Sequence, residues 1–226
     1  VVFDRVIENG DAEGAFESAA FVVERTFRHP RSTASPMEPR GAAAQPEDGG
    51  VAIWCSTQGP HNLKRIVTQL FGIDHVRVRC PDIGGGFGLK GVAYPEEMLV
   101  GWLALSLGRP VKWVETRSEH MTTSHHGRDQ VNYVKLGAKS DGTVTGLQVR
   151  IIADLGAYQL LLTPFIPELG FPVMGGCYRF PAIDLHFTGV FTNKMCTDAI
   201  RGAGRPEATY WIELTMDRLA DELGMD

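Results

Sequence analysis

Residues 83–90 are the stretch of this sequence best suited to holding an anionic ligand through its backbone. They read Ile-Gly-Gly-Gly-Phe-Gly-Leu-Lys, so half of the eight positions are glycine. Glycine lets backbone N–H groups approach a ligand closely and adopt positive φ angles, and successive N–H groups can hold phosphate or oxo groups. A P-loop needs Gly-Lys followed by Ser or Thr, whereas here Leu89 precedes Lys90 and Gly91 follows it. Alone, the stretch indicates either an anion-binding loop or a tight turn between two elements.

A second candidate loop covers residues 198–206, Asp-Ala-Ile-Arg-Gly-Ala-Gly-Arg-Pro. Arg201 and Arg205 lie just ahead of a helix that we expect to begin at Pro206. The positive end of the helix dipole and unpaired backbone donors favour an anion at such a place. The alternative is a helix entry whose arginines pair with surface carboxylates.

A third candidate is Gln58 in the segment Ser-Thr-Gln-Gly-Pro at residues 56–60, between an expected strand and an expected helix. Its amide offers both a hydrogen-bond donor and an acceptor. A glutamine at such a junction is more often a capping or surface residue than a catalytic one, so this signal is weak alone.

Three histidines, His120, His125 and His126, cluster in the sequence. They lack the His-Glu-x-x-His spacing of zinc metalloproteases. We therefore favour a solvated loop over a metal site made by these rings, and we predict no metal ligand in the chain.

The elements that must position the first and third loops form a strand–helix–strand–helix–strand unit. Its helices are expected to begin at Pro60 and Pro95, because proline is well tolerated in the first turn of a helix, and to end at Gly72 and Gly108. Its strands are expected at 51–56, 75–80 and 111–115.

Outside this unit, the pattern changes from alternating strands and helices to a block of strands. We expect strands at 131–139 and 143–153, joined by the hairpin signal Ser140-Asp141-Gly142. Further expected elements are a helix from Asp11, a strand over 21–27, a long connection over 29–50, an irregular segment over 158–180, a strand over 183–191 and a helix from Pro206. Strands that run in a block favour an α+β fold, which we describe as a two-layer mixed-sheet arrangement with two similar sub-units as an option.

Composition excludes several functional classes. The chain has 226 residues and a net charge of −5, which argues against a protein that binds nucleic acid through phosphate contacts. No apolar run is long enough to span a bilayer, and the N-terminus lacks the pattern of a secretory signal. We therefore expect a cytoplasmic protein.

Taken in this order, the three loops resemble the large subunit of molybdenum hydroxylases, the xanthine dehydrogenase and aldehyde oxidase family. The similarity is closest to carbon monoxide dehydrogenase large-subunit homologues that lack the copper-binding cysteine. The matching segments are Ser-Thr-Gln at 56–58, the glycine loop at 84–88 with Lys90, and Arg-Gly-Ala-Gly-Arg-Pro-Glu at 201–207. Met-Glu-Pro-Arg-Gly at 37–41 also resembles a segment of that family. The resemblance covers nearly the whole chain.

The resemblance implies a cofactor and a set of site residues. The cofactor would be molybdopterin, with the cytosine dinucleotide form as one alternative. Gln58 would hydrogen-bond an oxo ligand of molybdenum, and Arg201 would lie near the substrate pocket. The backbone beside the cofactor would come from Gly85, Gly86, Phe87 and Gly88. We divide the chain into an N-terminal helix, strand and linker over 1–50 and a molybdopterin-binding lobe over 51–226, with an optional split near 120–130.

The resemblance also implies an activity, the oxidation of an aldehyde or an N-heterocyclic carbon with water as the oxygen source. Gly91 stands where purine-oxidising members carry a substrate-contacting glutamate, and Gly202 where carbon monoxide dehydrogenases carry the copper-binding cysteine. The family's catalytic glutamate base has no match here, so we predict that the isolated chain is an inactive domain fragment.

The expected partners are a small-molecule substrate, the remainder of the large subunit, and iron–sulfur and flavin (FAD) groups on other domains or subunits. Exposed apolar surface would favour self-association. One alternative function is a non-catalytic scaffold or assembly domain of the same fold. Another is a phosphate- or nucleotide-binding domain built on the glycine loop alone.

Overall fold

The computed structural model of the chain describes residues 1–225 and divides them into two compact units. Unit 1 comprises Val1–Ser32, Gly127–Asp198 and the chain from Gly202 onward. Unit 2 comprises Thr33–His126 together with Ala199–Arg201. Each unit contains one mixed sheet with helices, so the predicted α+β class is confirmed. The boundary expected at residue 50 and the split near 120–130 stay predictions.

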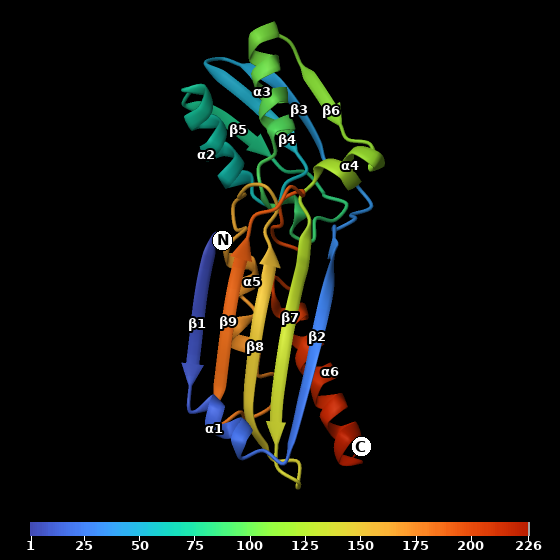
Figure 1. The fold of residues 1–226 in the computed structure, drawn as a ribbon. Helices are drawn as coiled ribbons and strands as arrows, with labels where there is room; N and C mark the ends of the chain where they lie inside the picture. Colours follow the sequence, from blue (N-terminus) through green and yellow to red (C-terminus); the bar gives the residue numbers. More distant parts are fainter. Residues whose placement is uncertain (226) are drawn as a thin grey trace. The chain divides into compact units, whose positions relative to one another are not determined.

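Unit 1 is built on a five-stranded sheet in the order β1-β9-β8-β7-β2 (Figure 1). Neighbouring strands are antiparallel except β8 and β9, which run parallel. The strands are β1 (Phe3–Asn9), β2 (Phe21–Ser32), β7 (Gly127–Ala138), β8 (Val144–Asp154) and β9 (Ile183–Val190). The remaining elements of this unit are α1 (Ala12–Glu17), α5 (Phe165–Glu168), a 3-10 turn (Phe171–Val173) and α6 (Arg205–Leu223).

Helix α6 covers one face of this sheet, where it packs on β2 and β7 (Figure 1). Its Trp211 and Ile212 are fully buried in a core shared with Leu147, Val149 and Phe187 of the sheet. Alternation along the strands places these apolar residues on one face. The opposite face is more polar, with Glu24, Lys135 and Arg150 beside Tyr133 and Ile152.

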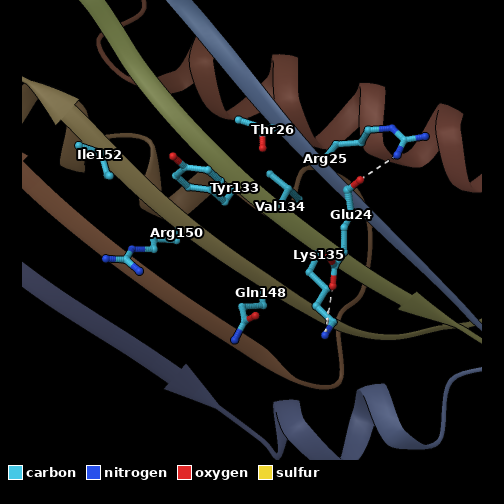
Figure 2. Close-up of a pocket in the computed structure, with 9 residues that line it drawn as sticks. All are labelled: Glu24, Arg25, Thr26, Tyr133, Val134, Lys135, Gln148, Arg150 and Ile152. Carbon is cyan, nitrogen blue, oxygen red and sulfur yellow. Dashed lines mark hydrogen bonds and ion pairs between the residues drawn. The ribbon is translucent and has the colours of Figure 1, made fainter.

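That opposite face carries a shallow hollow of about 830 Å³ (Figure 2). Tyr133 and Arg150 lie side by side in it on paired strands. None of the predicted site residues lines this hollow.

Unit 2 is built on a four-stranded sheet in the order β5-β4-β3-β6, with β4 and β5 parallel and the other pairs antiparallel. The strands are β3 (Gly41–Glu47), β4 (Gly50–Cys55), β5 (His75–Arg79) and β6 (Val111–Val114). The helices are α2 (Pro60–Phe71), α3 (Pro95–Leu107) and α4 (Arg117–Thr123), and a 3-10 turn covers Leu89–Gly91. Helices α2 and α3 bury Leu63, Val67, Val100 and Ala104 against Val51 and Ile53 of β4.

The predicted elements of unit 2 are mostly confirmed. Helices α2 and α3 begin at the predicted prolines and end before Gly72 and Gly108, which both take left-handed φ angles. The connection expected over 29–50 was wrong, since β2 continues to Ser32 and β3 occupies Gly41–Glu47. Strand β3 contains three alanines, a glutamine and a proline, so its sequence has little β propensity; its pairing with β4 and β6 determines its conformation.

Among the helices within residues 1–225, none combines the length and the apolar composition that a bilayer crossing requires.

Candidate functional site

The glycine loop of unit 2 adopts a backbone that few other residues could follow. Gly85 and Gly88 have φ angles of +96° and +97°, which are the left-handed values that favour glycine. Phe87 between them also has a positive φ of +54°, an unusual conformation for an aromatic residue, and its ring is about half exposed. The predicted loop is therefore a strained, glycine-dependent turn with an exposed aromatic side chain.

Gln58 lies directly against this loop. Its Oε1 accepts a hydrogen bond from the Gly88 N–H at 2.9 Å. A Cβ atom at Gly86 would lie only 2.5 Å from the same Oε1, so the glycine is what allows the amide to approach. Because Oε1 is fixed as the acceptor, the Nε2 group can act only as a donor, and it has no hydrogen-bond partner among residues 1–225. The amide is thus held in one orientation, with its N–H₂ group as a donor.

The backbone around Gln58 is also tied to the end of the loop. The Gln58 N–H donates to the Lys90 carbonyl at 2.8 Å, and the Thr57 hydroxyl donates to the same carbonyl at 3.2 Å. Thr57 Oγ1 accepts from the Gly59 N–H in turn. Residues 57–59 and 86–90 therefore form one hydrogen-bonded assembly.

The backbone around Arg201 joins the same assembly. Its N–H donates to the Phe87 carbonyl at 2.9 Å. A Cβ atom at Gly88 would lie 2.4 Å from the Ala199 carbonyl oxygen, so only glycine permits this approach. The Arg201 side chain is exposed. The structure thus brings residues from all three predicted loops together in unit 2, while residues 202–206 belong to unit 1.

A buried Tyr94–His125 pair supports this assembly and was not predicted as part of it. The Tyr94 hydroxyl lies 3.0 Å from the Leu89 carbonyl and 2.7 Å from His125 Nδ1. The other ring nitrogen of His125 lies 3.1 Å from the Ala199 carbonyl, so we assign its proton to Nε2. The pair therefore connects the end of the glycine loop to the segment that carries Arg201. A tyrosine just before a helix and a histidine 31 residues later give no sequence signal for this contact.

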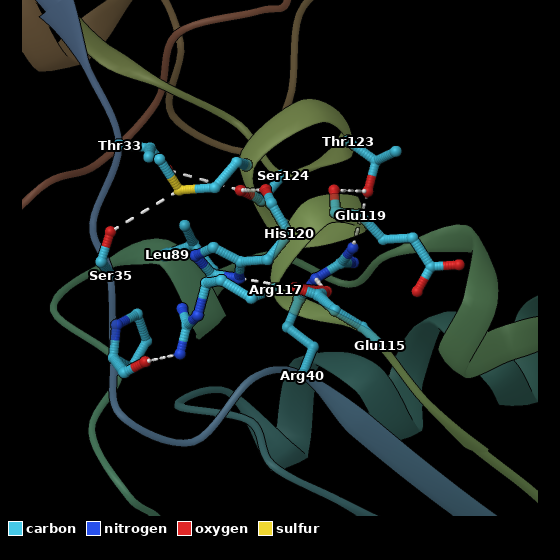
Figure 3. Close-up of polar contacts among 12 residues, drawn as sticks. Thr33, Ser35, Arg40, Leu89, Glu115, Arg117, Glu119, His120, Thr123 and Ser124 are labelled. Atoms are coloured by element: carbon cyan, nitrogen blue, oxygen red, sulfur yellow. Dashed lines mark hydrogen bonds and ion pairs between the residues drawn. The ribbon is translucent and has the colours of Figure 1, made fainter.

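The three clustered histidines do not form a metal centre. His120 is fully buried, with Nδ1 at 2.5 Å from Glu115 (Figure 3). Its Nε2 lies 2.8 Å from the Ala34 carbonyl. His126 Nε2 lies 3.4 Å from the Met121 carbonyl. Within residues 1–225, no group of three or more His, Cys, Asp or Glu side chains is arranged to hold a metal ion. The expectation of a solvated loop was wrong for His120 and His125, because both rings are buried in hydrogen-bonded contacts.

Arg40, from the segment at 37–41, is a fully buried cation in the same region. Its guanidinium bonds Glu115 at 2.5 Å and Glu96 at 3.2 Å, and it lies 3.7 Å from the centre of the Tyr94 ring. Figure 3 shows Arg40, Glu115 and His120 meeting below α4. A buried charge requires such partners, so this segment organises the interior beside the loops.

Together, these features define a cofactor-binding domain, with a glycine-lined backbone, an oriented amide donor and an adjoining arginine. The chain belongs to the family described as the molybdopterin cofactor-binding domain, which it matches over residues 1–226.

Individual relatives are similar over almost the whole chain. The chain is 35% identical over 220 residues to 6-hydroxypseudooxynicotine dehydrogenase complex subunit gamma of Paenarthrobacter nicotinovorans, covering 96% of this chain and 28% of that protein. It is 37% identical over 221 residues to the carbon monoxide dehydrogenase large chain of Hydrogenophaga pseudoflava, covering 95% of this chain and 28% of that protein.

A solved structure has the same fold. The crystal structure of quinoline 2-oxidoreductase from Pseudomonas putida 86 superimposes with a TM-score of 0.95 and 37% identity, covering 100% of this chain and 30% of that chain. The chain thus spans less than a third of the length of these proteins. The predicted family, fold class and cofactor are confirmed.

Proposed function

We propose that this chain is the part of a molybdenum hydroxylase large subunit that presents Gln58 and the glycine loop to molybdopterin. The observation that carries the proposal is the hydrogen bond from Gly88 to Gln58, which leaves the amide N–H₂ group as an oriented donor. The resident cofactor in this family carries oxo groups as acceptors, so the donor set fits it. Glycine at positions 86 and 88 lets the Gln58 amide and the Ala199 carbonyl lie against the loop, because a Cβ atom at either position would meet them within 2.5 Å.

The residues of the chain would bind and orient rather than react. Gln58 Nε2 would donate to an oxygen of the cofactor, and the backbone of Gly85, Phe87 and Gly88 would form the wall beside it. The exposed Arg201 guanidinium would attract an electron-rich group of the substrate. When bound, the cofactor supplies the two-electron oxidation of a carbon centre with water as the oxygen source. The iron–sulfur and flavin groups that accept the electrons would lie on other domains or subunits, and we place the enzyme in the cytoplasm.

We propose an aldehyde or an N-heterocycle as the substrate. Of the relatives, one is named as a subunit of a 6-hydroxypseudooxynicotine dehydrogenase complex and another as a quinoline 2-oxidoreductase. A Cβ atom at Gly91 would meet nothing within 4 Å, so this position offers open space where purine-oxidising members have a glutamate. Gly202 has a φ of +107°, and a Cβ there would lie 2.4 Å from Pro206. A copper-binding cysteine at Gly202 would therefore be strained, which disfavours carbon monoxide as the substrate.

The test is oxygen-isotope incorporation by the full-length subunit assembled with its partners. We would supply a panel of aldehydes and N-heterocycles in H₂¹⁸O with an artificial electron acceptor. The proposal predicts a hydroxylated product that carries ¹⁸O from water for at least one substrate class, and no turnover by the isolated 226-residue chain. Incorporation from O₂ alone, or robust turnover by the isolated chain, would contradict it.

A further inference from the structure

Lys90 at the end of the glycine loop is a buried cation that pairs with the carboxylate of Glu38. Its side chain is 0% exposed, and its Nζ lies 2.8 Å from Glu38 Oε2. The Glu38 side chain is 41% exposed. The two ends of this ion pair are therefore unequal, because the carboxylate reaches water and the ammonium does not.

Glu38 also fixes the start of the same loop. The oxygen that contacts Lys90 accepts a hydrogen bond from the Gly84 N–H at 2.8 Å, and the Glu38 N–H donates to the Gly84 carbonyl at 3.2 Å. A Cβ atom at Gly84 would lie 2.5 Å from the Glu38 Cβ, so a glycine is needed for this contact. One carboxylate thus joins the first residue of the loop to the lysine that ends it.

The charge state of Glu38 agrees with this arrangement. Burial opposes ionisation, but the hydrogen bonds from Lys90 and Gly84 outweigh it, and the pKa of Glu38 is lowered. The carboxylate is therefore ionised at neutral pH.

Lys90 is connected to Gln58 by backbone hydrogen bonds. The Lys90 carbonyl accepts from the Gln58 N–H and from the Thr57 hydroxyl. The loop that Glu38 and Lys90 close contains the Gly88 N–H, which orients the Gln58 amide. A shift of Lys90 would consequently move both contacts that hold Gln58.

We propose that Glu38 and Lys90 form a positioning pair that clamps the glycine loop and thereby sets the orientation of the Gln58 amide toward the cofactor. The inference rests on the proposed function for the identity of the ligand. Neither residue is assigned a contact with the cofactor or the substrate.

The unequal burial predicts an unequal response to mutation. Glu38→Gln leaves the ammonium of Lys90 buried without a counter-charge, which is costly. Lys90→Met replaces the ammonium by an apolar chain of similar size. The Glu38 carboxylate then remains in contact with water and still accepts the hydrogen bond from the Gly84 N–H. The double variant Glu38→Gln/Lys90→Met again leaves no buried charge. We therefore expect the positioning of Gln58 to be disturbed most in Glu38→Gln. The double variant should be disturbed less, to about the same extent as Lys90→Met.

The experiment compares these variants in the full-length enzyme by molybdenum content per polypeptide and by the Mo(V) EPR spectrum of the loaded fraction. Lys135→Met and Glu24→Gln are matched controls, since that pair lies 3.3 Å apart on the sheet of unit 1 with both side chains more exposed. We expect Glu38→Gln to lose at least threefold in molybdenum content and to alter the EPR spectrum. Lys90→Met should lose less, and the double variant should recover to the level of Lys90→Met but not to that of the wild type. The controls should match the wild type.

Two results would overturn the inference. The first is a Glu38→Gln enzyme with wild-type molybdenum content and an unchanged EPR spectrum. The second is a double variant that loses as much molybdenum as Glu38→Gln. The uncompensated charge of Lys90 would then not be the cause of the loss in Glu38→Gln. A wild-type enzyme without molybdenum would refute the proposed function itself, and this inference with it.

Discussion

The backbone N–H of Arg201 donates a hydrogen bond to the carbonyl of Phe87 at 2.9 Å. The donor comes from a short segment ahead of α6, and the acceptor comes from the glycine loop between β5 and α3. This bond holds the segment that carries the arginine guanidinium beside the loop that carries the amide contact. The proposed substrate-binding group and the proposed cofactor-binding group are therefore linked through main chain.

Arg201 has two roles that mutation can distinguish, a structural role of its backbone N–H and a proposed substrate-binding role of its guanidinium. Arg201→Ala keeps the N–H and removes the guanidinium, so KM should rise roughly tenfold, the effect of losing a charged hydrogen bond, while the melting temperature falls less than in a variant that also loses the N–H. Arg201→Pro removes the donor as well, so it should also lower the melting temperature. Thermal unfolding and steady-state kinetics of the full-length enzyme measure both effects. An equal loss of thermal stability in the two variants would contradict the separation.

Gln58→Glu tests the donor role of the amide. A glutamate keeps an oxygen that can accept from the Gly88 N–H, but its ionised carboxylate has no N–H to donate. We expect kcat to fall roughly 10²–10³-fold, as when one preorganised donor is removed from a reaction site, with little change in thermal unfolding. A Gln58→Glu enzyme with wild-type kcat would show that the donor is not used.

Gly86→Ala and Gly91→Ala form a matched pair in the same loop. Neither glycine takes a positive φ angle, but a Cβ atom at Gly86 would displace the Gln58 amide, whereas a Cβ atom at Gly91 would meet nothing within 4 Å. Gly86→Ala should lose the Gln58–Gly88 hydrogen bond, a net loss of about 1 kcal/mol, and should lower the molybdenum content. Gly91→Ala should be close to neutral. Urea unfolding and metal analysis distinguish them, and equal effects would argue against a specific contact at Gly86.

Glu97 in the core of unit 2 should make stability depend on pH. Burial raises its pKa to about 7, although hydrogen bonds from the Tyr94 N–H and from Cys55 oppose this. The raised pKa means that the folded state retains a proton which the unfolded state loses near the ordinary glutamate pKa of 4.5. The free energy of unfolding should therefore fall as the pH rises from about 4.5 to about 7, by up to roughly 3 kcal/mol.

Glu97→Gln should remove this dependence, because glutamine is uncharged at every pH. The variant should gain stability relative to the wild type between pH 5 and pH 8, as measured by urea unfolding of the chain at both values. Glu17→Gln, an exposed substitution at the end of α1, is the control. A difference between variant and wild type that does not change with pH would show that Glu97 is ionised in the folded state.

The sequence predicted the elements whose signals are local. Pro60 and Gly72 delimit α2 because proline tolerates the first helical turn and glycine tolerates the left-handed angle at the end. Asp11 caps α1 through a hydrogen bond from the Gly14 N–H. These effects depend on neighbours within a few residues, so they can be read without the fold.

The features that the sequence did not reveal depend on distant contacts. Strand β3 pairs with β4 and β6 although its alanines favour no strand, and α4 begins at a capping box formed by Thr116 and Glu119 that was overlooked. The clustering of His125 with His120 and His126 in the sequence indicated a metal ligand or a solvated ring. In the structure its ring contacts Tyr94 and the Ala199 carbonyl. The predicted role of Gln58 rests on the family resemblance. The contact of its Oε1 with the Gly88 N–H joins residues thirty positions apart and has no local sequence signal.

The most direct test of the central claim is the molybdenum content of the full-length subunit, purified with its partners and measured by inductively coupled plasma mass spectrometry. The proposed function predicts close to one molybdenum per polypeptide in the wild type. A wild-type subunit that is folded and assembled but contains no molybdenum would contradict it.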